Sequence, residues 1–404
     1  MKTYDHYRIQ ICAILLFVIL LSHRSGVAQF KSPTISNTTF LEFEDRSFQY
    51  YPLFRYNRVE GLFIGTGLQQ TINPIMKITA IGELGYGFSN KETRYKVGFY
   101  KNLFEFNKLR LGLNYFYDTA SKDDWLLSEV ENTIAAALFK YDYMDYYLEK
   151  GYKFYANQFL SQQAMQIRLE IIHSSYDIME RSTNWALFRK ESDFHSNPAI
   201  APGDETRYRI CMTFDTRDNP IHPRSGVKMD GIYEITEGDF ETEGVFISMR
   251  SYQPVGRRPQ IQTRLLIGAR NGSTAEQYLL DLGGIGTLPG FDDKEFRHGN
   301  RLMLYNFRYL FNGALLEKLP FSFIPFYDAL GLALFFNTGW LRFEDSGNEI
   351  GAFPGFEKIK FNQLKTDVGF SFSVADDFFL VDIAKRTDRA EHAWRVSARL
   401  LYRL

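Results

Sequence analysis

Side chains able to do acid–base, nucleophilic or metal chemistry are few and scattered in this sequence. Beyond residue 28 the histidines are His173, His195, His222, His298 and His392. Only His173 falls within a predicted strand, next to Ser174 and Ser175. Successive strand residues point to opposite faces, so His173 and Ser174 cannot form a base–nucleophile pair, and Ser175 lacks a third, orienting group. Since no metal-ligand spacing is present either, the sequence predicts neither an enzyme nor a bound cofactor or metal.

One polar stretch, residues 215–226, indicates a tight connection between two strands. Its informative residues are Asp215, Arg217, Asp218, Asn219, Pro223 and Gly226. Asp218 and Asn219 can hydrogen-bond to their own backbone, Pro223 fixes φ, and Gly226 accepts a positive φ. These properties account for the whole stretch as a structural turn, and we assign it no chemistry.

A second stretch reads Gly283-Gly284-Ile285-Gly286-Thr287-Leu288-Pro289-Gly290-Phe291 and lies in a long segment between predicted strands. Gly290 lets the backbone approach a neighbouring surface closely. Phe291 beside it can serve as an apolar anchor.

The elements that position both stretches are β-strands, because apolar and polar residues alternate over many segments. From Met165 to Ile171 the odd positions are apolar, whereas Gln166, Arg168 and Glu170 face the other way. About sixteen such segments occur, often ~10 residues long, which is the length that a tilted strand needs to cross a bilayer. Closing them into a barrel satisfies every backbone group without edges. The sequence therefore predicts an all-β fold, a transmembrane antiparallel barrel, and a large soluble β-protein is the alternative.

The predicted strands are 58–68, 76–88, 93–104, 109–118, 147–158, 164–175, 183–190, 205–215, 226–237, 244–254, 259–269, 300–310, 331–340, 365–374, 378–385 and 394–404. If the first strand starts in the periplasm, the long connections 191–204, 270–299 and 341–364 lie outside the cell. The partly helical segment 119–146 then lies at the periplasmic mouth.

Composition and the N-terminus fit a barrel in an outer membrane. The chain is 16% aromatic, with 25 Tyr and 37 Phe, as a lipid-facing band with two aromatic girdles requires. A net charge of −1 gives no bulk attraction to nucleic acid. Lys2 and Arg8, an apolar run from Ile11 to Leu21, and Gly26-Val27-Ala28 are typical of a cleaved export signal. We predict a signal peptide at 1–28, a short periplasmic segment at 29–54 and the barrel at 55–404.

Together, the two stretches resemble the BamA/TamA-type outer-membrane assembly and secretion barrels, the bacterial surface antigen superfamily. The family loop reads Gly-Gly, a short spacer, an aliphatic residue, then Arg-Gly-Phe or Arg-Gly-Tyr. Gly283, Gly284, Leu288, Gly290 and Phe291 match it, and Pro289 stands where the family has Arg. The resemblance implies that the loop folds back into the lumen of a sixteen-stranded barrel in a Gram-negative type of outer membrane.

In relatives the loop Arg contacts an acidic residue on each of the next two strands. The resemblance places Asn306 and Asn337 at those positions, so the cation and both carboxylates are replaced together. Neutral Asn avoids the desolvation cost of a buried carboxylate without a partner. We therefore expect packing and neutral hydrogen bonds to hold the loop, and a one-residue shift of alignment is the alternative.

A seam between first and last strands, which opens sideways in relatives, is also implied. Gly61, Gly65 and Gly67 interrupt the predicted first strand, and glycine weakens strand pairing. Relief of crowding where a barrel bends explains these glycines equally well. The last strand ends with Tyr402 and Leu404, which resembles the terminal insertion signal of such barrels but lacks its final aromatic residue.

By this resemblance the chain inserts proteins into the outer membrane or translocates them, through the lateral seam. Its partners are then membrane lipid and unfolded barrel or secreted proteins. A separate periplasmic partner is expected as well, because no receptor (POTRA) domain precedes the predicted barrel. Two alternatives remain: a passive or gated channel for small solutes, and an accessory subunit of a larger complex.

Overall fold

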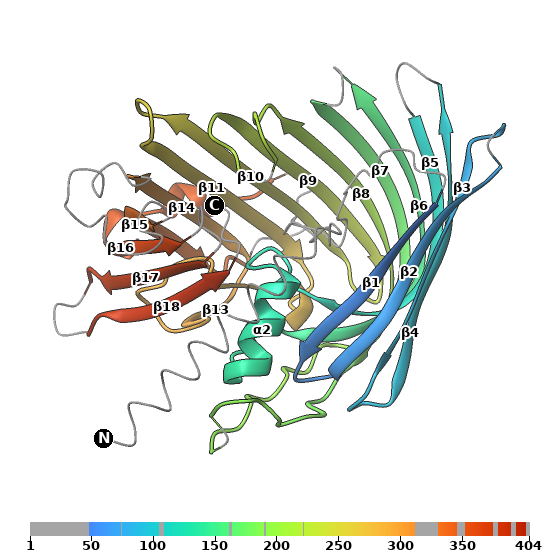
Figure 1. The fold of residues 1–404 in the computed structure, drawn as a ribbon, viewed down its shortest axis with the longest axis horizontal. Helices are drawn as coiled ribbons and strands as arrows, with labels where there is room; N and C mark the ends of the chain where they lie inside the picture. The colour runs from blue at the N-terminus through green and yellow to red at the C-terminus, as the bar shows by residue number, and fades with distance from the viewer. Residues whose placement is uncertain are drawn as a thin grey trace.

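The computed structural model describes residues 48–73, 75–104, 109–160, 164–189, 191–220, 222–311, 330–345, 352–374, 379–388 and 393–400. Its main feature is one sheet of sixteen antiparallel strands, each hydrogen-bonded to the next along the chain (Figure 1). The sheet curls around a lumen, which confirms the predicted transmembrane barrel. The predicted signal peptide, 1–28, and residues 29–47 lie outside the described residues.

The strands of the large sheet are β1 (Phe48–Asn57), β2 (Gly61–Asn73), β3 (Ile78–Gly87), β4 (Glu92–Leu103), β5 (Leu109–Ser121), β6 (Tyr146–Leu160), β7 (Met165–Ile178), β8 (Gly203–Asp215), β9 (Gly226–Gly238), β10 (Thr242–Pro254), β11 (Gln260–Gly272), β14 (Arg301–Leu310), β15 (Leu330–Arg342), β16 (Lys365–Val374), β17 (Phe379–Arg386) and β18 (Arg395–Leu400). The connections contain α2 (Glu129–Phe139), the 3-10 turns η2 (Glu276–Tyr278), η5 (Phe356–Lys358) and η6 (Phe361–Gln363), and the small hairpin β12 (Leu280–Leu282) and β13 (Phe296–Gly299). Within the described residues no helix has the length and apolar character to span a membrane.

The two faces of the sheet differ in polarity as the alternation predicts. On β7 the side chains of Leu169 and Ile171 are 53% and 50% exposed and point outward. Arg168 and Glu170, which alternate with them along the strand, are buried in the lumen. Because lipid covers an outward apolar face and a lumen accommodates polar side chains, this pattern suits a bilayer-spanning barrel.

One predicted strand is absent and one observed strand was not predicted, so the two errors cancel in the count of sixteen. The sheet begins with β1 at Phe48, not at residue 58, so the predicted barrel boundary at 55 falls inside β1. Pro52 interrupts the strand pattern there, since proline is confined to edge strands and bulges. Conversely, 183–189 contains no strand, because Leu187 donates its N–H to Ala137 at the end of α2 rather than to a sheet neighbour.

The extra first strand also corrects the placement of segment 119–146. That segment follows the fifth strand of the sheet, and 270–299 follows the eleventh, so both lie at the same end of the barrel. We call this the loop end, and the opposite end, which carries the 216–225 connection, the turn end. The two long segments are in direct contact, because Lys294 forms ion pairs with Asp123 and Asp145.

Candidate functional site

The 215–226 stretch forms the turn-end connection between β8 and β9. Arg217 forms an ion pair with Asp215 at 2.6 Å. The Asp218 carboxylate accepts the backbone N–H groups of Arg224 and Ser225. Gly226 has φ +109°, and an added Cβ would lie 2.4 Å from the Thr216 carbonyl oxygen. These contacts shape a turn far from the other predicted site residues.

The Asn219 carboxamide oxygen accepts the backbone N–H of His222 at 3.0 Å. The Pro223 carbonyl accepts the side-chain amide of Gln260 at 2.7 Å, which ties the turn to β11. Every residue of the predicted turn motif therefore has a structural part.

The lumen loop, meaning residues 283–296, is folded into the barrel. Leu288 and Phe291 are 0% and 1% exposed, and they pack with inward-facing side chains of β11 and β14. The cluster comprises Leu266, Leu282, Leu288, Phe291, Leu302 and Leu304. Gly283 and Gly284 adopt positive φ at the start of the loop. The predicted lumen-inserted loop is thus confirmed.

A relay of hydrogen bonds joins this loop to three successive strands. The Asn306 amide donates to the Thr287 carbonyl at 3.0 Å and to the Asn337 side chain at 2.8 Å. The Asn337 amide donates to the Asp367 carboxylate at 2.7 Å, which accepts the Gly290 N–H at 2.7 Å. Asn306 therefore contacts the loop directly, whereas Asn337 acts through Asp367.

The structure corrects one part of the expected neutral anchoring. Asn306 and Asn337 are direct cross-strand partners on β14 and β15. A carboxylate nevertheless faces the loop, because Asp367 stands one strand beyond the two that the resemblance considered. The sequence feature that could have identified this contact is Asp367 itself, a carboxylate near the start of a strand of mainly apolar and small residues.

Gly290 and Phe291 fit closely against β16 and β17. A Cβ at Gly290 would lie 2.7 Å from the Asp367 Cβ and 3.0 Å from the Arg386 backbone nitrogen. The Arg386 guanidinium lies 4.1 Å from the centroid of the Phe291 ring and forms an ion pair with Glu295 at 3.0 Å. Pro289 carries no charge, and the cation beside Phe291 is Arg386 of β17.

Lys294 is the main charged anchor of the lumen loop. Its ammonium lies 2.6 Å from the Asp123 carboxylate and 2.5 Å from that of Asp145, and all three are buried. Burial lowers the pKa of Lys294, but the two carboxylates outweigh burial and raise it above its usual range. Burial raises the pKa of Asp145, yet Lys294 outweighs this, and the pKa is lowered.

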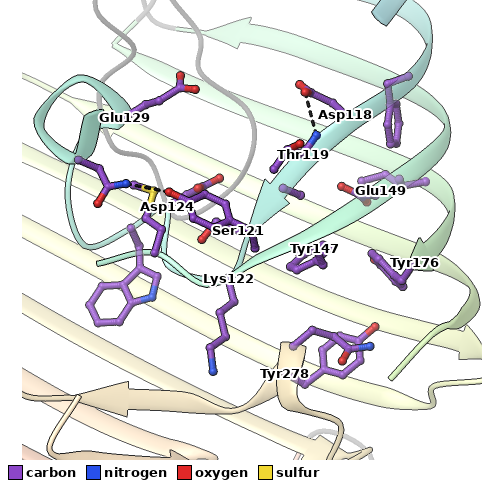
Figure 2. Close-up of a pocket in the computed structure, with 18 of the residues that line it drawn as sticks. Asp118, Thr119, Ser121, Lys122, Asp124, Glu129, Tyr147, Glu149, Tyr176 and Tyr278 are labelled. Atoms are coloured by element: carbon purple, nitrogen blue, oxygen red, sulfur yellow. Dashed lines mark hydrogen bonds between the residues drawn. The ribbon is translucent and has the colours of Figure 1, made fainter. Parts of the chain in front are cut away.

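A cavity of about 300 Å³ remains between the loop-end segments and the inner face of the sheet. Figure 2 shows Tyr147 and Tyr176 side by side on its wall, with Lys122 extending toward Tyr278. Tyr176 donates to Glu205 at 2.5 Å, and Lys122 is paired with Glu276 at 2.6 Å. These polar groups bond to one another, so the cavity wall is a structural network.

The candidate base His173 and the neighbouring Ser174 bond to different partners in the structure. His173 bonds to Thr206 at 3.1 Å, and Ser174 donates to Glu149 on the other face of the strand. No group of three or more His, Cys, Asp or Glu side chains among the described residues is arranged to hold a metal ion.

The seam, meaning the facing edges of β1 and β18, is the second candidate site. Backbone pairing between β1 and β18 is not present among the described residues, and these strands are the two ends of the sheet. The Leu62 carbonyl accepts the backbone N–H of Phe88, so the backbone groups of Leu62 point toward β3. Tyr56 lies opposite Leu62 on β1, and its backbone groups therefore point away from β2. Pro52, four residues earlier, has the same orientation and no N–H to offer at this edge.

The glycines predicted at the seam lie elsewhere. Gly61, Gly65 and Gly67 belong to β2, the second strand, and not to the edge. At Gly67 a Cβ would lie 2.2 Å from the ring of Tyr51, and at Gly65 it would lie 2.6 Å from the Leu84 carbonyl oxygen. Relief of crowding therefore explains them. Tyr402 and Leu404 lie outside the described residues.

Comparison with known proteins supports the fold. A family described as "Family of unknown function (DUF5686) C-terminal domain" matches residues 31–212. No curated protein matches the chain. Among solved structures, a BamA from Haemophilus ducreyi lacking POTRA domains 1–3 is similar, with a TM-score of 0.57 at 12% identity, over 88% of this chain and 70% of that one. The chain has the fold of this barrel.

CdiB from Acinetobacter baumannii and CdiB from Escherichia coli are more distant, with TM-scores of 0.42 and 0.40 at 11% and 9% identity. Each comparison covers 88% of this chain, and 60% and 62% of the respective CdiB chains.

Proposed function

We propose that this chain is an outer-membrane barrel that inserts proteins into the membrane, or translocates them across it, through the seam between β1 and β18. The observation that carries the proposal is the free edge of β1. Its outward-directed backbone groups are not paired with the last strand among the described residues. An extended polypeptide can add to such an edge by backbone hydrogen bonds. The BamA-like fold and the resemblance of the two sequence stretches support the same function.

The filled lumen supports a route at the seam rather than through the barrel axis. The lumen loop buries Leu288 and Phe291 against the inner wall. Lys294 and Asn306 then fix the loop to the loop-end segment and to β14. A substrate strand at the edge of β1 does not need to displace any of these contacts.

The remaining parts of the proposal follow from this function. Residues 1–28 serve as the export signal, and the chain resides in a Gram-negative type of outer membrane. Its partners are lipid, unfolded barrel or secreted proteins, and a separate periplasmic protein that delivers them. No catalytic step, cofactor or nucleic acid is involved.

Site-specific photocrosslinking tests the proposal. A photoreactive phenylalanine analogue replaces Phe54 on β1, and the control replaces Phe99 on β4, since both side chains are well exposed on the outer face. The protein is reconstituted in liposomes with an unfolded outer-membrane barrel protein as substrate. We expect substrate adducts at Phe54 and not at Phe99. Equal or absent adducts, together with solute flux through the liposomes, would favour the channel instead.

A further inference from the structure

Helix α2 lies at the seam and contacts both edge strands. In Figure 1, β1 (blue) and β18 (red) are the two ends of the curled sheet, and α2 lies between them in the view. The helix packs on β1 through Ala136, which contacts Tyr56 in a buried cluster with Phe194. It reaches β18 through Glu131, whose carboxylate binds the Arg399 guanidinium. A single helix therefore bridges the two strands that a closed barrel would join directly.

On the β1 side, α2 occupies a position that belongs to a neighbouring strand. The Tyr56 N–H points away from β2, and the Thr133 side-chain hydroxyl accepts it at 3.0 Å in a buried contact. In a sheet this N–H would donate to a carbonyl of the next strand. Since Thr133 satisfies it, the edge of β1 is capped at that point by the helix.

On the β18 side the contact is a two-point ion pair. The Arg399 Nε and one terminal nitrogen lie 2.9 and 3.1 Å from the two Glu131 oxygens, and the two side chains are 7% and 5% exposed. Such bidentate geometry fixes orientation as well as distance. We call Glu131 and Arg399 the latch pair.

The first turn of α2 also carries a weaker tie to β1. Glu129 lies 3.6 Å from Arg55, but the Glu129 side chain is 42% exposed, and Arg55 has closer partners in Glu60 and Asp118. Ser128 caps the helix by accepting the Glu131 N–H. Two carboxylates of one helical turn thus face opposite edges of the seam, Glu129 toward β1 and Glu131 toward β18.

We propose that α2 is a displaceable occupant of the seam, held by the latch pair, and that an extended strand must remove it to pair with β1 at Tyr56. This inference rests on the proposed function. The geometry makes the helix and a substrate strand alternative occupants, because the Tyr56 N–H can donate to Thr133 or to a strand carbonyl. Breaking the latch pair frees α2 from β18 and leaves its contacts with β1 to hold it.

Distances between spin labels test the latch without any substrate. Labels are placed at Ala135 on α2 and Val396 on β18, in full-length protein with Cys12→Ser and Cys211→Ser, reconstituted in liposomes. We expect one narrow distance distribution in this parent. Glu131→Gln should add a second, longer population, and Arg399→Gln should add the same one, because each breaks the pair from a different element. The matched control Glu129→Gln should leave the distribution unchanged.

An unchanged distribution in both latch variants, or equal broadening in Glu129→Gln, overturns the latch. The parent protein and Glu129→Gln establish that the labelled barrel folds, as judged by heat-modifiable migration in gels. A tether completes the test: Glu131→Cys with Arg399→Cys, joined by a bifunctional maleimide, should abolish the Phe54 substrate adducts. Substrate adducts at Phe54 that persist with the tether in place also overturn the latch proposal.

The experiments distinguish a failure of the latch proposal from a failure of the proposed function. If the distances respond as expected but substrate adducts never form in any variant, then α2 is releasable and the proposed function is wrong. If adducts form at Phe54 while the distances stay fixed in the latch variants, the function holds and α2 is a permanent part of the wall.

Discussion

The lumen loop and the seam helix are both wedged against the inner side of the barrel wall, but they are held by different kinds of contact. Apolar burial dominates in the lumen loop, where Leu288 and Phe291 are almost completely covered. Complete burial of such side chains contributes roughly 1.5–3 kcal/mol each. Among the described residues, the contact of α2 with β18 instead centres on the buried ion pair of Glu131 with Arg399.

This difference in contacts indicates which of the two segments can be displaced from the barrel wall. An ion pair in a buried site gains Coulomb energy but loses hydration, so its net contribution is small. Apolar packing has no such compensation, and the loop would expose its cluster on leaving. The lumen loop is therefore a fixed obstruction of the lumen, whereas the β18 side of α2 is held by a contact that can be released at small cost.

Removing the lumen loop should produce the largest effect. Deletion of residues 283–299 removes Leu288 and Phe291 from the apolar cluster, together with the contacts of Lys294 and Gly290. Ion conductance in planar bilayers should rise several-fold, because the axis of the barrel loses its main obstruction. The Glu131→Gln variant is the comparison, since release of α2 should change the conductance far less. Equal conductance in the deletion and the parent protein would mean that other segments block the lumen.

Lys294→Met should destabilise the loop by about 3–5 kcal/mol, because it leaves the buried Asp123 carboxylate without its ion-pair partner and leaves Asp145 with Arg58 as its cation. Loop exposure is measured as the labelling rate of a thiol introduced at Thr287. The triple variant Lys294→Met, Asp123→Asn and Asp145→Asn carries none of the three charges and should recover most of the loss. Failure of the triple variant to recover would show that packing around the ammonium, and not charge, holds the loop.

The same site fixes the expected pH dependence. The raised pKa of Lys294 means that its stabilisation is present below about pH 10 and is lost above the folded pKa. The lowered pKa of Asp145 means that its stabilisation is present above about pH 4 and is lost in stronger acid. Burial raises the pKa of the neighbouring Asp293 to about 7, so its ionisation opposes packing of the loop as the pH rises from about 4 to about 7. Thiol labelling in the parent protein should therefore increase over that range and stay constant from about pH 7 to about pH 10.

The sequence predicted the sheet well and its first edge poorly. Alternation on β7 and β8 is strong because lipid and lumen impose opposite polarity on neighbouring residues. In β1 the same alternation is interrupted by Pro52, which acts at the free edge where no ladder hydrogen bond is lost. Pro52 therefore made β1 hard to predict from the sequence, and the same residue marks β1 as an edge strand.

The loop was predictable and its partners only in part. Gly290 and Phe291 identify a segment that approaches a surface closely, and Asn306 was found from the resemblance. Lys294 pairs with Asp123 and Asp145, which are about 150–170 residues away in the chain. Such pairing depends on which connections share one end of the barrel, and the missing first strand reversed that assignment for 119–146. The latch pair, 268 residues apart, was equally out of reach.

Gly290→Ala tests how closely the loop fits against the wall. The added methyl group would meet the Asp367 Cβ at 2.7 Å and the Arg386 backbone nitrogen at 3.0 Å. Overpacking of this kind costs about 1–3 kcal/mol. Gly231→Ala on β9 is the matched control, because nothing lies within 4 Å of its added Cβ. Thiol labelling at Thr287 should rise only in Gly290→Ala, and equal rates in the two variants would place the loop away from β16.

The smallest effect should come from the exposed tie between the lumen loop and the seam. Asp292 and Arg395 form an ion pair, but their side chains are 69% and 45% exposed. Exposed pairs contribute about 0–1 kcal/mol, and salt near 1 M shortens the screening length to about 3 Å. Asp292→Asn should therefore raise thiol labelling slightly in dilute buffer, and the difference should vanish in concentrated salt. The Lys294→Met difference should persist in the same salt, since buried pairs are screened much less. If salt removed both differences, the Lys294 site would be open to solvent, and the contrast between a fixed loop and a releasable helix would rest on apolar packing alone.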